Sequence, residues 1–408
     1  MNTNYKNTKT SFSLTLLSHI LKNLPAKNRI GIPLLRFLPK LGFSSFVRIN
    51  IGHYVFELEV NHEFHIYMIM GFTEKAFNPI LKKILRQGDT FVDVGAEVGF
   101  ISALAGNIIR KTGKMLVFEP DPRIFPRLKK HLEFTKGNDV PETIIFDKAC
   151  SDYEGEVTMH LAPVFGQSYL HNQKLENKNN LVQIKTVTID NVIKKEGIKN
   201  IRLLKMDVEG HEISALRGLK NALSEKMIDY IIIEKNTWRL DINYYSPYHL
   251  HSFLTHFGYR GAHWDGKSIT KESLNRNALE DLIYARNEEL LKHIYPEYTE
   301  DTSDSRFKPD EIEAYWNEAK EPKKPSIQEI QSIKLIVKAR EGKIKEAIQE
   351  GEELLKNYPD FISFRGHLAH WYLSTGNLKK AKEHFLKIAS ENPDDKEVQA
   401  ILNKMKNI

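Results

Sequence analysis

The sequence contains a single cysteine, Cys150, among its 408 residues. One cysteine excludes a disulfide within the chain and any zinc site built from several thiolates. The sequence also lacks a run of about 20 apolar residues, the length that a helix needs to cross a bilayer. These absences are typical of a protein from a reducing compartment, and we expect a cytoplasmic location.

The sequence also lacks a large excess of charge of either sign. Lysine and arginine total 59, aspartate and glutamate total 53, and the net charge is +6. No dense basic run is present, so we expect no nucleic-acid partner. Hydrophobic residues at 41% and charged residues at 27% are ordinary for a globular chain and exclude disorder throughout. At about 150 residues per domain, the length predicts two or three domains.

The first 45 residues predict an amphipathic helical segment. Leu17, Ile20, Leu21 and Leu24 recur at helical spacing, with basic residues after them. No small-residue cleavage site follows, so we do not expect a signal peptide. Two roles stay open for this segment: it packs on the protein's own core, or it contacts the inner face of a membrane peripherally.

A β-hairpin is predicted next. Apolar residues alternate from Tyr54 to Val60 and again from Phe64 to Met70, with a short polar break between them. This hairpin would place His62 and His65 on opposite faces. We therefore expect no metal ion there.

Short apolar strands then alternate with amphipathic helical segments. This alternation predicts an α/β fold with a doubly wound, mostly parallel sheet covered by helices on both faces. Ligands bind beyond the carboxyl ends of such strands, and several of the expected strands end in an acidic residue. The expected strands are Thr90–Val94, Met115–Glu119, Thr143–Asp147, Ile201–Asp207, Ile228–Glu234 and Leu279–Arg286.

The first of these strands leads into a glycine turn, Gly95 to Gly99, and Glu119 ends the next strand. A glycine turn followed by an acid indicates an adenosine cofactor, because the carboxylate accepts the ribose hydroxyls. Dinucleotide sites need a glycine where this turn has Glu97, whose charge would repel a pyrophosphate. S-adenosylmethionine has no phosphate and carries a sulfonium, so we favour it. A dinucleotide and an empty, degenerate site are the alternatives.

Four segments together resemble the FkbM family of methyltransferases. They are D-V-G-A-x-x-G at 93–99, F-E-P-D-P at 118–122, L-K-M-D-V-E-G-H-E at 204–212 and I-I-I-E at 231–234, and the similarity covers roughly residues 50 to 290. The resemblance implies a class I, Rossmann-like fold that uses S-adenosylmethionine. It also implies O-methylation of hydroxyl groups on sugars, glycans or polyketide products. Glu97 departs from the family, which usually has Asn at this position.

The resemblance gives the strand-end residues roles. The cofactor would contact Asp93, Gly95, Ala96, Glu97 and Gly99 through its methionine part, Glu119 and Pro120 through its ribose, and Lys148 and Ala149 near its adenine. On the acceptor side, we expect Asp207, Glu209 and His211 to be catalytic, Ser168 and Glu234 to contact substrate, and Asp207 to border the cofactor as well. Helix capping is the alternative for Asp207 and Glu209. We favour a reaction without a metal, and magnesium is the alternative.

The C-terminal part contains a repeat with a period of 34 residues, which resembles the tetratricopeptide repeat. The matching pairs are Gly342 and Gly376, Ala347 and Ala381, and Pro359 and Pro393. Such repeats commonly bind protein partners. The predicted parts are the N-terminal segment 1–45, a methyltransferase domain 46–293, a charged linker 294–325 and repeats 326–408. The alternative function is a non-catalytic interaction protein with a degenerate methyltransferase domain.

Overall fold

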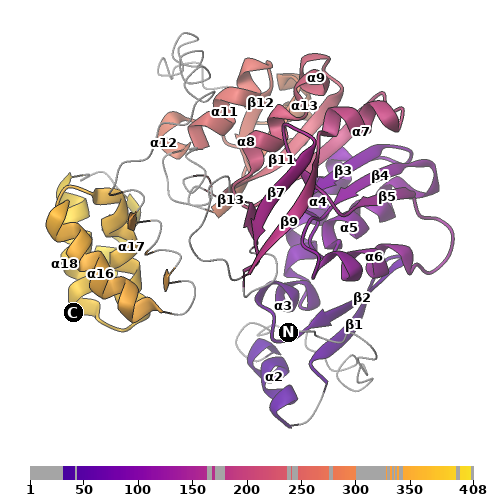
Figure 1. Ribbon diagram of the computed structural model, residues 1–408. Helices are drawn as coiled ribbons and strands as arrows, with labels where there is room; N and C mark the ends of the chain where they lie inside the picture. The colour runs from indigo at the N-terminus through magenta and orange to yellow at the C-terminus, as the bar shows by residue number, and fades with distance from the viewer. Residues whose placement is uncertain are drawn as a thin grey trace. The chain divides into compact units, whose positions relative to one another are not determined.

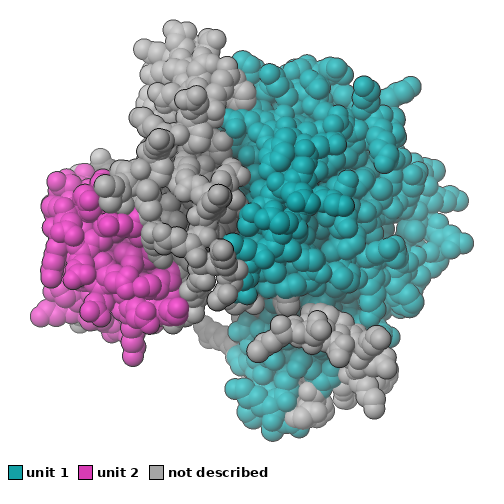
Figure 2. Space-filling model, viewed as in Figure 1, with its two compact units in different colours: residues 1–321 teal, residues 322–408 magenta. Residues whose placement is uncertain are grey.

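The computed structural model divides the chain into two compact units, residues 1–321 and 322–408 (Figures 1 and 2). It describes residues 31–41, 44–162, 168–170, 180–236, 240, 247–274, 279–299, 328, 331–332, 335, 338–339, 343–391 and 396–405. The predicted N-terminal helix and most of the predicted linker lie outside these residues. None of the helices in the described part of the chain has the length and apolar character of a membrane span. The predicted domain limits stay predictions.

A seven-stranded sheet, in the order β12-β13-β11-β10-β3-β4-β5, forms the centre of the first unit. Neighbouring strands from β11 to β5 pair in parallel, whereas β13 is antiparallel to β11 and β12. The predicted α/β fold of the class I methyltransferase type is confirmed. The strands are β3 (Thr90–Val94), β4 (Lys114–Phe118), β5 (Glu142–Phe146), β10 (Ile201–Met206), β11 (Ile228–Asn236), β12 (Arg260–His263) and β13 (Leu279–Ala285).

Helices cover both faces of this sheet (Figure 1). Along β3, Phe91 belongs to one hydrophobic core and Val92 to the other, because successive side chains point to opposite faces. Burial on both faces explains the nearly continuous apolar strands. The first core includes α4 (Phe72–Ile84), α5 (Phe100–Ile109), α6 (Phe125–Glu133) and α13 (Glu288–Ile294). The second includes α7 (Ile189–Lys195), α8 (Glu212–Arg217), α9 (Lys220–Ser224) and α11 (Pro247–His256).

The position of the N-terminal hairpin was predicted wrongly. β1 (Phe46–Ile51) pairs with β2 (Tyr54–Glu59), and the expected second strand is instead helix α3 (Glu63–Ile69). Ile66, Ile69 and Met70 are buried, and their i, i+3, i+4 spacing is that of one helical face, although the alternation at 64, 66, 68 and 70 also fits a strand. His62 caps the helix, because its Nδ1 accepts a hydrogen bond from the main-chain N–H of His65 over 3.4 Å.

A second, four-stranded sheet follows β5 in the chain, in the order β6-β9-β7-β8. This sheet was not predicted from the sequence pattern. Met159 and Leu170 of this sheet pack in a small hydrophobic core with Ala149. The strands are β6 (Ala149–Cys150), β7 (Gly155–His160), β8 (Tyr169–Leu170) and β9 (Leu181–Val187).

The second unit consists of helices in its described part. Ala347 and Ala381, the small residues of the predicted repeat, are fully buried, which allows neighbouring helices to approach closely. Gly376 has a φ of 81° in the turn between two helices. Gly342 and Pro393 lie outside the described residues. The helices are α16 (Ile344–Asn357), α17 (Ile362–Ser374), α18 (Leu378–Glu391) and α19 (Lys396–Lys404).

Candidate active site

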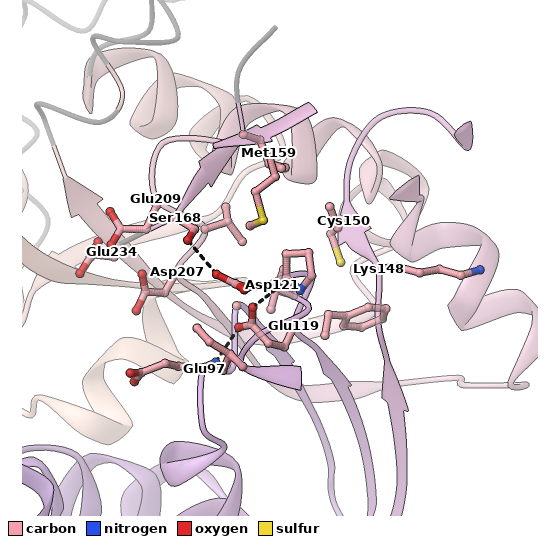
Figure 3. Close-up of a pocket in the computed structure, with 18 of the residues that line it drawn as sticks. Glu97, Glu119, Asp121, Lys148, Cys150, Met159, Ser168, Asp207, Glu209 and Glu234 are labelled. Carbon is pink, nitrogen blue, oxygen red and sulfur yellow. Dashed lines mark hydrogen bonds between the residues drawn. The ribbon is translucent and has the colours of Figure 1, made fainter. Parts of the chain in front are cut away.

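A pocket lies beyond the carboxyl ends of β3, β4 and β10, where the sequence places its acidic residues (Figure 3). The second sheet contributes an apolar wall that includes Met159 and Leu170, and α3 contributes Phe64. The carboxyl groups of the lining belong to Glu97, Glu119, Asp121, Asp207, Glu209 and Glu234. Gly95, Pro120, Lys148, Ala149 and Ser168 also line it. The pocket therefore combines an acidic floor with an apolar wall.

The glycine turn after β3 is held in place by its neighbours. The N–H groups of Gly95 and Ala96 both donate to the main-chain oxygen of Phe118 over 3.0 Å. Gly95 has a φ of 80°, and a Cβ there would collide with the main-chain oxygen of Asp207. Only glycine fits this position without a shift of the main chain. Gly99, with a φ of 84°, precedes the first turn of α5.

Glu119 connects the turn to the end of β4. Its carboxylate accepts hydrogen bonds from the N–H of Glu97 over 2.9 Å and from the N–H of Asp121 over 2.8 Å. Glu119 is only 6% exposed, and burial raises its pKa to about 8 even though these N–H groups favour the charged form. A carboxyl group at this place is suited to bind hydroxyl groups of a ligand, because hydrogen bonds from those hydroxyls favour its charged form.

Ser168 lines the pocket and lies against Asp121, and its contact with a substrate stays a prediction. Its hydroxyl donates to Asp121 Oδ2 over 2.7 Å and accepts from Arg123 over 2.8 Å. Arg123 also pairs with Asp121 at 2.7 Å. Burial raises the pKa of Asp121. The hydrogen bonds from Arg123 and Ser168 lower it by more, so the pKa lies below its usual value. Asp121 was not among the predicted site residues, although it follows Pro120 directly.

Asp207 stands at the end of β10, at the centre of the acidic floor. Its main-chain N–H donates to the oxygen of Val94 over 2.9 Å, and its carboxylate accepts from Lys205 Nζ over 2.9 Å. Glu209 accepts a hydrogen bond from the Asn236 amide over 3.3 Å. Burial and the charges of Asp207 and Glu209 raise the pKa of Glu234 well above its usual value. Asp207, Glu209 and Glu234 thus lie together, as Figure 3 shows.

Two predicted site residues are buried and do not line the pocket. Asp93 is fully buried and accepts a hydrogen bond from Ser102 over 2.5 Å. His211 is 3% exposed, and its Nε2 is 3.1 Å from Ser151 Oγ. Burial lowers the pKa of His211 to about 4. Neither residue is among the described residues of the lining, and neither are Ala96 and Gly99.

One compact group of metal-ligand side chains occurs in the described ranges: atoms of His62, His65 and Glu97 lie within 4.8 Å of one another. The expectation that the two histidines face apart was wrong, because their rings stack with centroids 4.0 Å apart. Each Nδ1 accepts a main-chain N–H, from His65 for His62 and from Glu59 for His65. An imidazole that accepts such a bond in its neutral form carries its proton on Nε2, which then offers no lone pair to a metal.

Two segments of the chain match known families. Residues 93–260 match the sequence model described as the methyltransferase FkbM domain, and residues 338–405 match a tetratricopeptide repeat. The hexuronic acid methyltransferase AglP of Haloferax volcanii is 24% identical over 155 residues. That match covers 38% of this chain and 59% of the relative. The chain thus spans about three fifths of this curated relative's length.

Solved structures of methyltransferases are also similar. Aeropyrum pernix fibrillarin in complex with S-adenosyl-L-methionine is 13% identical with a TM-score of 0.30, over 52% of this chain and 74% of that chain. The O-methyltransferase from Bacillus cereus in complex with SAH is 10% identical with a TM-score of 0.30, over 67% and 97% of the two chains. The segment 93–260 therefore matches the FkbM methyltransferase domain, and the segment 338–405 matches a tetratricopeptide repeat.

Proposed function

We propose that this protein is an S-adenosylmethionine-dependent O-methyltransferase that methylates a hydroxyl of a sugar, a glycan or a related natural product. The observation that carries the proposal is the pocket in which the glycine turn, Glu119 and Asp207 meet. The curated relative, a hexuronic acid methyltransferase, supports a sugar-type acceptor.

The residues of the pocket fit S-adenosylmethionine. Glu119 would accept the ribose hydroxyls, and Ala149, Met159 and Leu170 provide an apolar wall beside it for the adenine. The turn from Gly95 to Gly99 would face the methionine part. When bound, the cofactor supplies a methyl group on a sulfonium. The anionic Glu97 side chain opposes a dinucleotide, because it would repel a pyrophosphate.

Asp207 would act as the proton acceptor for the attacking hydroxyl. Its main-chain bond to Val94 fixes it relative to the glycine turn, so the acceptor oxygen and the methyl group can be aligned within about 3 to 3.5 Å. A carboxylate that removes the hydroxyl proton contributes about 10² to 10⁴ in rate. Glu209 and Glu234 would border the acceptor, and Ser168 would stabilise the wall through Asp121.

Titration calorimetry with S-adenosylmethionine tests the cofactor, with Glu119→Gln as the matched variant. We expect binding by the wild type and a loss of affinity of about tenfold or more in Glu119→Gln, because the carboxylate is the acceptor for the ribose. Absence of wild-type binding at millimolar cofactor would reject the enzyme and favour the interaction protein.

Mass spectrometry of surface glycans, from cells with and without the gene, tests the acceptor. We expect the loss of one methyl group from one sugar. Unchanged glycans, together with measurable cofactor binding, would place the acceptor among smaller natural products instead.

We further propose that the repeats bind a protein partner and that the enzyme works in the cytoplasm. The match of residues 338–405 to a tetratricopeptide repeat supports the protein partner. A pull-down with residues 322–408, followed by a reciprocal pull-down with the captured protein, tests it. Capture that persists when the repeat region is deleted from the full chain would contradict it.

A further inference from the structure

The turn after β10 holds Glu209 in an unusual backbone conformation. The N–H of His211 donates to the main-chain oxygen of Val208 over 3.3 Å, and the two residues between them, Glu209 and Gly210, have φ values of 55° and 97°. Positive φ at both central residues is the pattern of a type I′ turn, which favours glycine, asparagine or aspartate. Gly210 suits its position, whereas Glu209 adopts its conformation at a cost. The residue types of the turn therefore do not account for its shape.

Glu212 supplies the contact that holds this turn. Its Oε1 accepts hydrogen bonds from the N–H of Gly210 over 3.1 Å and from the N–H of Val208 over 3.3 Å. The side chain is fully buried, and Glu212 is the first residue of α8. One oxygen thus bonds the main chain on both sides of Glu209, in the kind of concave turn that main-chain N–H groups form around an anion. Rotation of the main chain at Glu209 would break at least one of these bonds.

The turn determines where the Glu209 side chain lies. Glu209 lines the pocket beside Asp207 and Glu234 (Figure 3), and its Oε2 accepts a hydrogen bond from the Asn236 amide over 3.3 Å. A strained residue in a pocket lining is typical of a functional position. Glu212 is not among the described residues of the lining. Any effect of its geometry on a bound ligand therefore passes through the turn.

We propose that Glu212 is a positioning residue, which holds the turn from Val208 to His211 and so directs the Glu209 carboxylate into the pocket. This inference rests on the proposed function, in which Glu209 borders the acceptor. A turn released from Glu212 would move Glu209 towards negative φ, where an ordinary residue is more stable. The Cα–Cβ bond of Glu209 would then point in another direction.

The role of Glu212 needs an oxygen acceptor and not a charge. Burial raises the pKa of Glu212 to about 7, although the N–H of Gly210 favours the charged form. A protonated carboxyl group keeps a carbonyl oxygen that accepts both N–H groups. The other oxygen, Oε2, is buried and has no hydrogen-bond partner among the described residues. Glu212→Gln therefore keeps the contact, whereas Glu212→Met has a similar size and removes it.

Urea unfolding of the cofactor-free protein is the test, because the stabilities of Glu209→Gly and Glu209→Ala report the conformation at this position. Glycine is the more stable of the two at positive φ, and alanine is the more stable at negative φ. In the wild-type background and with Glu212→Gln, we expect a higher unfolding midpoint for Glu209→Gly. With Glu212→Met, this advantage of glycine should disappear or reverse.

Lys226 offers a matched control. Its φ of 56° is close to that of Glu209, but it precedes β11. The parallel pairing of β10 and β11 places it at the opposite edge of the sheet from the turn. Lys226→Gly should remain more stable than Lys226→Ala in all three backgrounds. Loss of the glycine advantage at both positions would contradict a local role for Glu212.

A glycine advantage at position 209 that persists with Glu212→Met, or that is lost with Glu212→Gln, would overturn the proposal. If Glu212→Met does not fold, Glu212→Ala, which leaves room for water beside the two N–H groups, carries the same comparison. These measurements need neither cofactor nor acceptor. A failure of the proposed function therefore appears in calorimetry with S-adenosylmethionine, whereas a failure of this inference appears in the unfolding midpoints.

Transfer of labelled methyl groups to a glycan extract gives the functional readout. We expect Glu209→Gly and Glu212→Met each to reduce transfer about tenfold, because both remove the Glu209 carboxylate from the acceptor side. The double variant should lose no more than either single variant, and Glu212→Gln should keep most of the wild-type rate. Losses that multiply in the double variant would show that Glu212 acts independently of Glu209 and would contradict a positioning role.

Discussion

The main chain of Asp207 lies directly against Gly95, so that a Cβ at position 95 would collide with the Asp207 oxygen. The N–H of Asp207 also donates to the oxygen of Val94 over 2.9 Å. The turn that would face the cofactor and the carboxylate that would face the acceptor are therefore in contact. A change in one displaces the other.

Gly95→Ala is accordingly expected to weaken binding of S-adenosylhomocysteine by about tenfold or more, since the new methyl group pushes the turn away from β10. Calorimetry measures the affinity. Gly137→Ala is the control: its φ of 90° brings about the same backbone strain, of roughly 1 to 2 kcal/mol, but the nearest atom to its Cβ is His53 Nδ1 at 3.9 Å. Equal affinities in the two variants would contradict the role of the contact.

The pH dependence of stability should reveal the buried acids. Burial raises the pKa of Glu119 to about 8 in the folded protein, whereas an unfolded glutamate titrates near about 4.3. The folded state thus holds this proton more tightly, so the contribution of Glu119 to the free energy of unfolding is complete below about pH 4 and is lost as the pH rises through 8.

Urea unfolding of the cofactor-free protein between pH 5 and 8 checks this dependence. We expect Glu119→Gln to lose less stability than the wild type over this range. The variant lacks the carboxyl group that, in the wild type, releases a proton on unfolding. Glu142→Gln, whose side chain is 65% exposed at the start of β5, should keep the wild-type slope. A wild-type slope in Glu119→Gln would show that Glu119 is already ionised in the fold.

Glu97→Asn should tighten S-adenosylmethionine binding if Glu97 lies near the methionine carboxylate. Burial and the charge of Asp207 raise the pKa of Glu97 to about 7, so repulsion grows as the pH rises from 6 to 8. Its removal is worth about 1 kcal/mol at pH 8 and less at pH 6. Weaker binding in Glu97→Asn would instead show that Glu97 attracts a cationic part of the cofactor.

The central strands were predictable because burial on both faces makes them nearly continuous apolar runs. β3 was predicted with its observed limits, Thr90–Val94, and the acidic residues after the strands meet at one edge, as parallel topology requires. The antiparallel direction of β13 was not visible, because β12, which pairs with it, has only four residues. Such a short segment shows no periodicity.

Other features depend on contacts between distant parts of the chain. The apolar residues from Phe64 to Met70 fit the spacing of a strand and also that of a helix. Packing against the core stabilises the helix. The two-residue strands β6 and β8 exist only as partners of longer strands. The bond between Ser168 and Asp121 joins residues 47 positions apart. No local pattern predicts such a contact.

Deletion of residues 322–408 should leave the affinity for S-adenosylmethionine unchanged. These residues form a compact unit of their own, and the described residues of the pocket lie between Phe64 and Glu234. Calorimetry on the shortened chain, after circular dichroism confirms that it is folded, tests this. Loss of binding in a folded shortened chain would show that the repeat region completes the pocket.

Asp207→Asn should reduce turnover by about 10² or more while cofactor affinity stays nearly constant. Asparagine keeps the shape of the side chain and the main-chain bond to Val94, but it cannot take a proton from the acceptor. The measurement is labelled methyl transfer to a glycan extract, beside calorimetry with S-adenosylhomocysteine. Glu209→Gln is the matched variant, because Glu209 lines the same floor and is bonded to Asn236. If Asp207 is the base, Glu209→Gln should lose less activity than Asp207→Asn.

The same assay separates this route from one that uses a metal ion. Magnesium prefers several oxygen ligands in octahedral geometry, and the Asp207 carboxylate already contacts Lys205, a cation that would oppose a second positive charge beside it. We therefore expect a chelator to leave turnover unchanged. Turnover that collapses with chelator and returns with magnesium would overturn the metal-free route, and full activity in Asp207→Asn would remove Asp207 from the reaction.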